Sequence, residues 1–158
     1  MTVAVCPGSF DPITLGHLDV VRRASLLYDD VVLAVATNAT KVTLLDLAER
    51  VALARHAVSG VPRVRVEPVP GLLVDFCREI GATALVKGLR NGADYDAELP
   101  MALMNRHLGI ETVFLPADHS VAHIASSLVK EVARYGGTID DLVPDGVAEA
   151  VRARIGSE

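Results

Sequence analysis

Short β-branched runs alternate with helical patterns along the whole chain, and this alternation limits the possible folds more than any other feature. Strands are predicted at Thr2–Cys6, Val31–Ala36, Val64–Glu67, Thr83–Lys87 and Thr112–Leu115. Helices are predicted at His17–Tyr28, Leu47–Val58, Leu72–Ile80, Glu98–His107, Ser126–Tyr135 and Val147–Ile155. Strand–helix alternation with short connections favours right-handed crossovers and a parallel sheet. We therefore expect an α/β fold with one doubly wound, Rossmann-like sheet of five parallel strands and helices on both faces.

The size and composition of the chain suit one such domain. Its 158 residues can bury a single sizeable core. Hydrophobic residues make up 51% of the chain and aromatic residues only 4%, so this core must be mainly aliphatic, as is typical of parallel strands buried beneath helices. We predict a single domain over residues 1–158, on which the C-terminal helices from about residue 138 onward pack.

Local signals mark several helix ends. Asp46 and Glu49 have the spacing of a capping box, in which the two side chains accept hydrogen bonds from free backbone N–H groups. Gly136-Gly137 predicts a helix end, because glycine adopts the left-handed conformation without strain. A proline inside a helix removes one hydrogen bond and clashes with the preceding turn. Because of Pro100, we expect the helix around Glu98–His107 to begin near Leu99 or to kink.

Charge and hydropathy argue against several classes of protein. The net charge of −5 argues against a general nucleic-acid binder, because such proteins neutralise phosphates with a basic face. No apolar run approaches the roughly 20 residues of a membrane span, and the first residues lack the basic start of a secretory leader. Cys6 and Cys77 lie in apolar surroundings and are expected to be reduced packing residues. We expect a cytoplasmic protein that binds neither nucleic acid nor membrane.

Small and basic residues follow the strands, at the edge where doubly wound sheets bind ligands. The first strand runs into the segment CPGSFDPITLGH, which ends at His17. Lys41 follows the second strand, Lys87, Gly88 and Arg90 end or follow the fourth, and Ser126-Ser127 begins the helix after the fifth. Helix starts add positive potential through their free N–H groups. The sequence therefore predicts a phosphate-binding edge within an acidic protein.

Each of these residues also has an ordinary explanation. His17 is placed to donate a hydrogen bond to charge developing on phosphoryl oxygens, but a histidine in a first helical turn can also be a plain surface residue. The forked donors of Arg90 suit phosphate, whereas a solvated surface position is the alternative for lysines, above all Lys41. Ser126 and Ser127 are either helix caps or an anion site. The remaining histidines and the cysteines show no metal-ligand spacing, so no protein metal site is expected.

The segments PGSFDPITLGH, VKGLR and ASSLVKEVARYGG together resemble the nucleotidyltransferases that share a (T/H)-x-G-H signature. This signature also occurs in cytidylyltransferases and class I aminoacyl-tRNA synthetases. The stretches KGLR-x-x-x-D-Y, MNRHL and SSLVKEVA narrow the resemblance to the bacterial phosphopantetheine adenylyltransferases, over nearly the whole chain.

This resemblance implies a reaction, adenylyl transfer from ATP to 4′-phosphopantetheine, which gives dephospho-coenzyme A and pyrophosphate in coenzyme A biosynthesis. The acceptor phosphate attacks the α-phosphorus of ATP in line, without a covalent enzyme intermediate, so the protein mainly positions reactants and neutralises charge. The resemblance also implies Mg²⁺, carried mainly by the ATP phosphates, and a homohexamer.

By matching position, the resemblance makes His17, Lys41 and Arg90 catalytic residues, with His17 stabilising the transition state at the α-phosphate. The ATP-binding residues that it implies are Ser9, Phe10, His17, Gly88, Leu89, Arg90, Glu98, Val121, Ala122, His123, Ile124, Ala125, Ser126 and Ser127. The phosphopantetheine-binding residues that it implies are Ser9, Lys41, Leu73 and Lys87.

The segment Val121–Ser127 departs from the family pattern, which has two aromatic residues and a further serine there. The loss of these residues is expected to alter the packing around the nucleotide and with it the affinity for ATP. His123 could compensate for this loss by contacting a phosphate. Two other functions stay open from the sequence. One is a related nucleotidyltransferase with another phosphate acceptor, such as nicotinamide mononucleotide or glycerol phosphate. The other is a non-catalytic nucleotide-binding protein.

Overall fold

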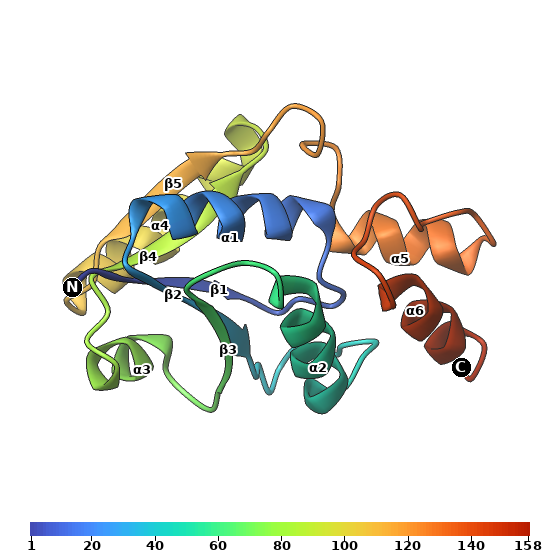
Figure 1. Cartoon of the computed structure of the whole chain (residues 1–158), viewed down its shortest axis with the longest axis horizontal. Helices are drawn as coiled ribbons and strands as arrows, with labels where there is room; N and C mark the ends of the chain where they lie inside the picture. The colour runs from blue at the N-terminus through green and yellow to red at the C-terminus, as the bar shows by residue number, and fades with distance from the viewer.

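The computed structural model describes residues 1–158, and its five strands form one parallel sheet in the order β3-β2-β1-β4-β5. The strands are β1 (Val3–Gly8), β2 (Asp30–Ala36), β3 (Val64–Val69), β4 (Ala84–Leu89) and β5 (Thr112–Pro116). The helices are α1 (Leu15–Leu27), α2 (Leu47–Val58), α3 (Leu73–Glu79), α4 (Gly92–His107), α5 (Ser126–Arg134) and α6 (Val147–Ile155). The predicted α/β fold, with five parallel strands and helices on both faces, is confirmed (Figure 1).

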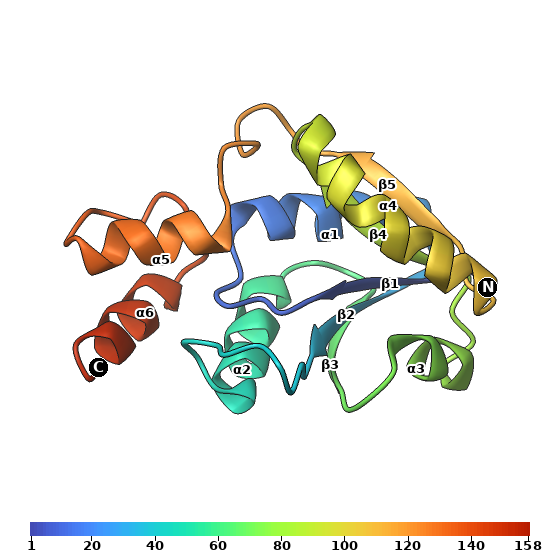
Figure 2. The ribbon, with the colours of Figure 1, turned by 180° about the vertical axis from the view of Figure 1, so that it is seen from behind.

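The side chains of β1 alternate between two cores, because successive residues of a strand point to opposite faces of the sheet. Ala4 and Cys6 belong to a larger cluster that includes residues of α1 and α2, whereas Val3 and Val5 belong to a smaller cluster that includes residues of α3. Both clusters are almost entirely aliphatic, as the composition indicates, and Phe10 is the one fully buried aromatic residue. Helix α4 covers β4 and β5, as the view from behind shows (Figure 2).

The C-terminal segment extends the larger cluster. Ile139, Val143, Val147 and Val151 are all buried in it. Helix α6 packs against α5, and the two helices lie together at one end of the molecule (Figure 1). Val129 of α5 belongs to the same cluster, so apolar contacts hold α5 against the C-terminal segment.

Most predicted elements appear at their predicted places. The bounds of α2 and α6 agree with the prediction, and the capping box at the start of α2 is present, with Asp46 and Glu49 each accepting a backbone N–H at 2.9 Å. Strands β1 and β4 each extend two residues further than predicted, to Gly8 and Leu89. The ladders continue through these residues, although glycine and proline weaken the sequence signal for a strand.

The start of α4 was predicted wrongly. The helix begins at Gly92, where the side chain of Asn91 caps it by accepting the N–H of Asp94 at 2.9 Å. Pro100 therefore lies inside the helix and leaves the carbonyl group of Asp96 without its usual partner. Both residues are exposed, so water can satisfy this carbonyl group.

The two serines at the start of α5 are not helix caps. Ala125 occupies the cap position, so Ser126 and Ser127 form the first positions of the helix itself. The hydroxyl group of Ser126 instead donates to the carbonyl oxygen of Pro12 at 2.8 Å. At the other end, Gly136 has a φ of +77°, which confirms the predicted helix end.

Both cysteines are free and buried, as predicted. Burial raises the pKa of the Cys6 thiol to about 12 and that of the Cys77 thiol to about 11. Thiols with such pKa values stay protonated at neutral pH and act as packing groups.

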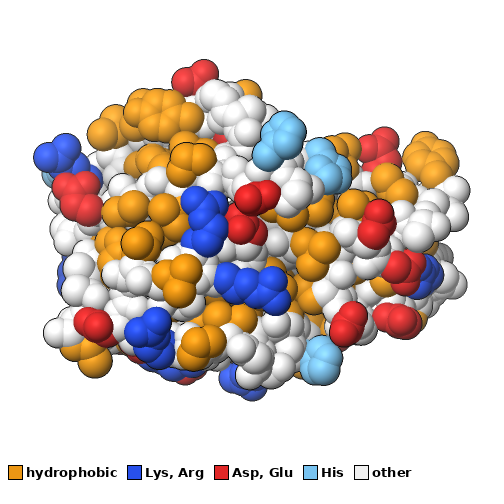
Figure 3. All heavy atoms as spheres, turned by 45° about the horizontal axis from the view of Figure 1, so that its top comes forward, with side chains coloured by type: hydrophobic (Ala, Val, Ile, Leu, Met, Phe, Trp, Pro, Cys, Tyr) orange, Lys and Arg blue, Asp and Glu red, His pale blue; other side chains and the backbone are white.

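The surface carries mixed charges. On the face shown in Figure 3, basic side chains lie among acidic ones and do not form one continuous basic surface. No helix combines the length and the apolar composition needed to cross a bilayer.

We predict that Leu33→Ala lowers the free energy of unfolding by about 2–5 kcal/mol, because Leu33 is fully buried in the larger cluster and its truncation leaves a cavity. Leu26→Ala is the matched control, since this leucine is 79% exposed and its truncation is expected to change stability by at most about 0.5 kcal/mol. Urea denaturation of both variants measures the difference. Equal losses would contradict the assignment of Leu33 to the core.

Candidate functional site

A cavity of about 540 Å³ lies at the carboxyl edge of the sheet. The β1–β4 ladder pairs only Ala4 with Ala84 and Val5 with Leu85, whereas β1 pairs with β2 at six positions. The cavity opens beyond this short ladder and is lined there by Pro7 and Gly8 of β1 and by Lys87 and Gly88 of β4. It therefore occupies the position where doubly wound sheets bind ligands, between neighbouring strands whose connections leave in opposite directions.

Most of the residues singled out from the sequence line this cavity. They are Ser9, Phe10, His17, Lys41, Lys87, Gly88, Arg90, Glu98, Val121, Ile124, Ala125, Ser126 and Ser127. The structure places four others outside its lining, namely Leu73, Leu89, Ala122 and His123. His123 is exposed and does not line the cavity, so its contact with a phosphate stays a prediction.

The loop between β1 and α1 forms one wall. Phe10 adopts a φ of +49° and packs its ring edge-on against the imidazole of His17, with the ring centres 4.9 Å apart. A Cβ atom at Gly8 would lie 3.0 Å from the Phe10 ring, so glycine lets this ring approach β1 without being displaced. The glycine of the PGSF sequence thus positions the aromatic ring that supports His17.

The hydrogen bonds of His17 define its tautomer. Its Nδ1 atom accepts the backbone N–H of Thr14 at 3.0 Å, so in the neutral imidazole the proton is on Nε2. Burial and, to a smaller extent, the nearby charge of Arg90 lower the pKa of His17 from 6.5 to about 4. The cavity therefore contains a neutral imidazole whose Nε2–H is a hydrogen-bond donor at neutral pH.

Four cationic side chains line the cavity, namely Lys41, Lys87, Arg90 and Lys130, and two of them have acidic partners on α4. Lys87 forms an ion pair with Glu98. Arg90 contacts Asp94 through Nε at 3.0 Å and Nη2 at 3.1 Å, and this hydrogen bond, together with the charge of the guanidinium group, holds the pKa of Asp94 below its ordinary value. Lys41 has no carboxylate partner, and its Nζ atom lies 3.5 Å from the hydroxyl group of Ser9.

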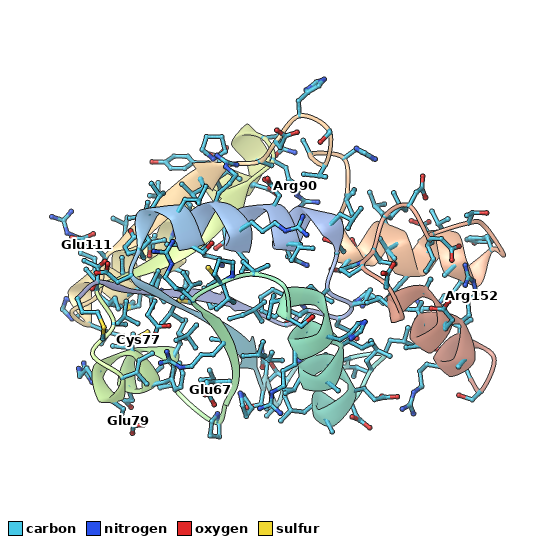
Figure 4. All side chains as sticks on the ribbon, in the orientation of Figure 1. Glu67, Cys77, Glu79, Arg90, Glu111 and Arg152 are labelled. Atoms are coloured by element: carbon cyan, nitrogen blue, oxygen red, sulfur yellow. The ribbon has the colours of Figure 1, made fainter.

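Arg90 connects the two walls of the cavity. Its Nη1 atom donates to the carbonyl oxygen of Ile124 at 3.4 Å, in the segment before α5. Figure 4 shows its side chain beside α1, near this segment. The guanidinium group thus lies between β4 and the start of α5, where the helix contributes its own positive potential.

Three residues important for this geometry were not recognised in the sequence: Asp11, Arg50 and Lys130. Arg50 is 5% exposed and donates to the carbonyl oxygens of Ser9, Ala36 and Leu45. Asp11, which is buried, forms an ion pair with the partly buried Lys130 at 2.8 Å. Asp11 could have been singled out as the acidic residue of the phosphate-facing loop, but Arg50 and Lys130 look like ordinary exposed residues of amphipathic helices.

The carboxylates of the cavity all have cationic partners. Asp11, Asp94 and Glu98 line it, and each is paired with a cationic side chain. No group of three or more potential metal ligands occurs anywhere in the chain.

A model of the cytidylyltransferase-like family matches residues 5–132, which include every residue that lines the cavity. Over nearly its full length the chain is also similar to curated bacterial proteins named phosphopantetheine adenylyltransferase. The protein from a Nocardioides species is 54% identical over 156 residues, covering 98% of each chain. The protein from Kocuria rhizophila is 55% identical over 153 residues, covering 96% of this chain and 98% of its own.

Among solved structures, a protein of Vibrio parahaemolyticus assigned as a nicotinate-nucleotide adenylyltransferase superimposes with a TM-score of 0.73. The match covers 100% of this chain and 97% of the other, but only 18% of the residues are identical. This likeness establishes the shared fold and carries no information about the acceptor.

The depressed pKa of His17 predicts a pH dependence of stability. Between pH 6.5 and about 4 the unfolded chain binds a proton on this histidine and the native protein does not. The contribution of His17 to the free energy of unfolding therefore falls as the pH falls through this window. Urea denaturation at several pH values across the window should show that the free energy of unfolding changes less with pH in His17→Gln than in the unmodified protein. In an NMR titration of the unmodified protein, the His17 ring signals should stay unchanged down to about pH 5. Ring signals that titrate near pH 6.5 would contradict the buried, neutral imidazole.

Proposed function

The chain belongs to the phosphopantetheine adenylyltransferase family of nucleotidyltransferases, and we propose that it transfers the adenylyl group of ATP to 4′-phosphopantetheine at the cavity described above. The identity of about half of all residues to these relatives, over the full chain, carries this proposal. The cavity supports it chemically, because basic side chains, a helix start and a neutral histidine converge there.

In the proposed reaction an oxygen of the acceptor phosphate forms a bond to the α-phosphorus of ATP. The bond between this phosphorus and the bridging oxygen breaks, and pyrophosphate leaves with the electron pair. Such a transfer requires positioning and charge neutralisation more than acid–base chemistry. The cavity agrees with this requirement, since cations and hydrogen-bond donors line it.

His17 is proposed to donate its Nε2–H to an oxygen of the α-phosphate. The backbone N–H of Thr14 occupies Nδ1, which orients the imidazole before substrate binds. A fixed donor of this kind stabilises charge that grows in the transition state without first having to reorganise. Because the pKa of His17 is low, its imidazole acts as a neutral hydrogen-bond donor and not as a general acid.

The basic residues are proposed to divide between the two substrates. Lys41 and Lys87 hold the acceptor phosphate, and Arg90 with the start of α5 holds the phosphates of ATP. Ser9 is proposed to lie at the junction of the two substrates. Its hydroxyl group lies 3.5 Å from the Lys41 ammonium group. When a phosphate enters, Lys87 exchanges its ion pair with Glu98 for the more highly charged ligand.

The remaining assignments also stay proposals. Phe10, Gly88, Leu89, Glu98 and the segment Val121–Ser127 are assigned to ATP, and Leu73 is assigned to the pantetheine arm, outside the cavity itself. Mg²⁺ is proposed to arrive as part of the MgATP substrate, because every carboxylate of the cavity is already paired. We also propose that the protein forms a homohexamer and is located in the cytoplasm.

Pyrophosphate release with MgATP and 4′-phosphopantetheine tests this function, run beside nicotinamide mononucleotide with ATP and glycerol 3-phosphate with CTP. We expect release only with 4′-phosphopantetheine. Release with another acceptor would replace the substrate, and ATP binding without any release would favour a non-catalytic nucleotide-binding protein.

For the role of His17, we predict that His17→Ala lowers kcat by about 10²–10³-fold with little change in KM, because the lost hydrogen bond strengthens only in the transition state. His56→Ala is the matched control, since His56 is exposed on α2 and away from the cavity. A His17→Ala enzyme with near-normal kcat would rule out this role.

For the division of the basic residues, we predict opposite effects of two variants. Lys41→Ala should raise KM for phosphopantetheine by about 10–100-fold and leave KM for ATP nearly unchanged, whereas Arg90→Ala should do the reverse, because each removes a charge-assisted hydrogen bond to one substrate. Steady-state kinetics with each substrate varied in turn measures both values. Equal effects of both variants on both substrates would contradict the division.

A further inference from the structure

Three segments that carry the site meet at the side chain of Asp11. Its Oδ1 atom accepts the backbone N–H of Leu45 at 2.9 Å, and its Oδ2 atom accepts that of Leu44 at 2.9 Å. Oδ2 also accepts a hydrogen bond from Nζ of Lys130 on α5 at 2.8 Å. Asp11 itself belongs to the loop that carries Ser9 and Phe10 and leads to His17.

These segments leave different strands and have no sheet ladder between them at this point. The segment with Leu44 and Leu45 follows β2 and carries Lys41, whereas α5 follows β5 and begins with the two serines that line the cavity. Arg50 joins the first of these segments to the β1–α1 loop, and Ser126 joins α5 to that loop. Asp11 is the side chain that contacts all three.

We call this meeting point of the three segments at the Asp11 side chain the joint. The chemistry of its contacts requires a carboxylate. Asp11 is 3% exposed, and all three of its partners are N–H donors. Burial alone would raise the pKa of the Asp11 carboxyl, but the Lys130 ammonium group and the N–H groups of Leu45 and Leu44 hold the pKa below its ordinary value. An amide has only one accepting oxygen and directs its own donors at the other partners, so it cannot replace the carboxylate.

We propose that Asp11, through its ion pair with Lys130, is a positioning residue of the transfer reaction that fixes the acceptor-facing segment around Lys41 relative to the nucleotide-facing start of α5. This inference rests on the proposed function. In-line transfer depends on the relative placement of two substrates, and a displacement of about 1 Å can lower its rate by about 100-fold. The contacts of Asp11 span the two sides between which this displacement would occur.

The test compares Asp11→Asn, Lys130→Met and Lys130→Arg with a core variant of similar stability. Ile110→Ala is the control, because Ile110 is 7% exposed and precedes β5 at the opposite edge of the sheet from the cavity. Thermal unfolding, kcat for pyrophosphate release and the Kd of MgATP by calorimetry are measured for each protein at a temperature where it is folded.

We expect Asp11→Asn and Lys130→Met to lower kcat by about 10–100-fold while the Kd of MgATP changes no more than a few-fold. Lys130→Arg, which keeps the positive charge beside Asp11, should recover most of kcat. Losses of Tm with unchanged kcat, as expected for Ile110→Ala, would make the pair merely structural and overturn the proposal. A higher Kd of MgATP in Lys130→Met alone would make Lys130 a phosphate ligand and would also overturn it.

Hydrogen exchange tests the joint independently of activity. In Asp11→Asn, amides of Leu44–Leu45 and of the first turn of α5 should both exchange faster than in the unmodified protein, because Leu44 and Leu45 lose the acceptor of their N–H groups and α5 loses the anchor of its Lys130 side chain. Faster exchange confined to Leu44–Leu45 would contradict the joint. If the unmodified protein shows no turnover, the proposed function is disproved. The hydrogen-exchange result then still tests whether Asp11 connects the three segments. If Asp11→Asn does not fold, Lys130→Met carries the same kinetic prediction, and faster exchange in the first turn of α5 is expected there too.

Discussion

β1 and β4 lie next to each other at the centre of the sheet, yet their ladder covers only Ala4–Val5 and Ala84–Leu85. The connection after β1 leads through α1 to β2 on one side, and the connection after β4 leads through α4 to β5 on the other. The space between the two strand ends is therefore left open, and the main chain of Gly8 and Gly88 can line it. Every other feature of the site is placed around this opening. Gly88 serves it in a second way, because a Cβ atom there would lie 2.6 Å from the side chain of Val20 on α1.

The charges of the site are compensated within the protein. An acidic chain with a net charge of −5 places cations at one edge, and α4 supplies carboxylates for two of them. These pairs position Lys87 and Arg90, and in the proposed reaction an entering phosphate competes with a carboxylate for donors already in place. Burial and the nearby charge of Arg90 keep His17 neutral, so the cavity combines positively charged side chains with a neutral donor that is oriented by Thr14.

Sequence periodicity predicted the elements well because most of them are determined locally. The aliphatic runs of β1 and β2 and the capping box of α2 each carry their own signal. Positions after the strands indicated the cavity, since the carboxyl edge collects loops from every strand. The early start of α4 was missed because Pro100 argues against a helix, whereas the Asn91 cap and the exposed carbonyl group of Asp96 permit one. Asp11 and Lys130 were missed because their contact joins residues 119 positions apart.

Direct in-line transfer, with no covalent enzyme intermediate, is the central chemical claim for this cavity. The configuration at the α-phosphorus tests it most directly, using ATP made chiral by sulfur at that position and 4′-phosphopantetheine as acceptor. A single displacement inverts this centre, and inversion in the dephospho-coenzyme A analogue is the expected result. Retention would require two displacements through a group of the protein, and would contradict a site that acts by positioning and charge neutralisation alone.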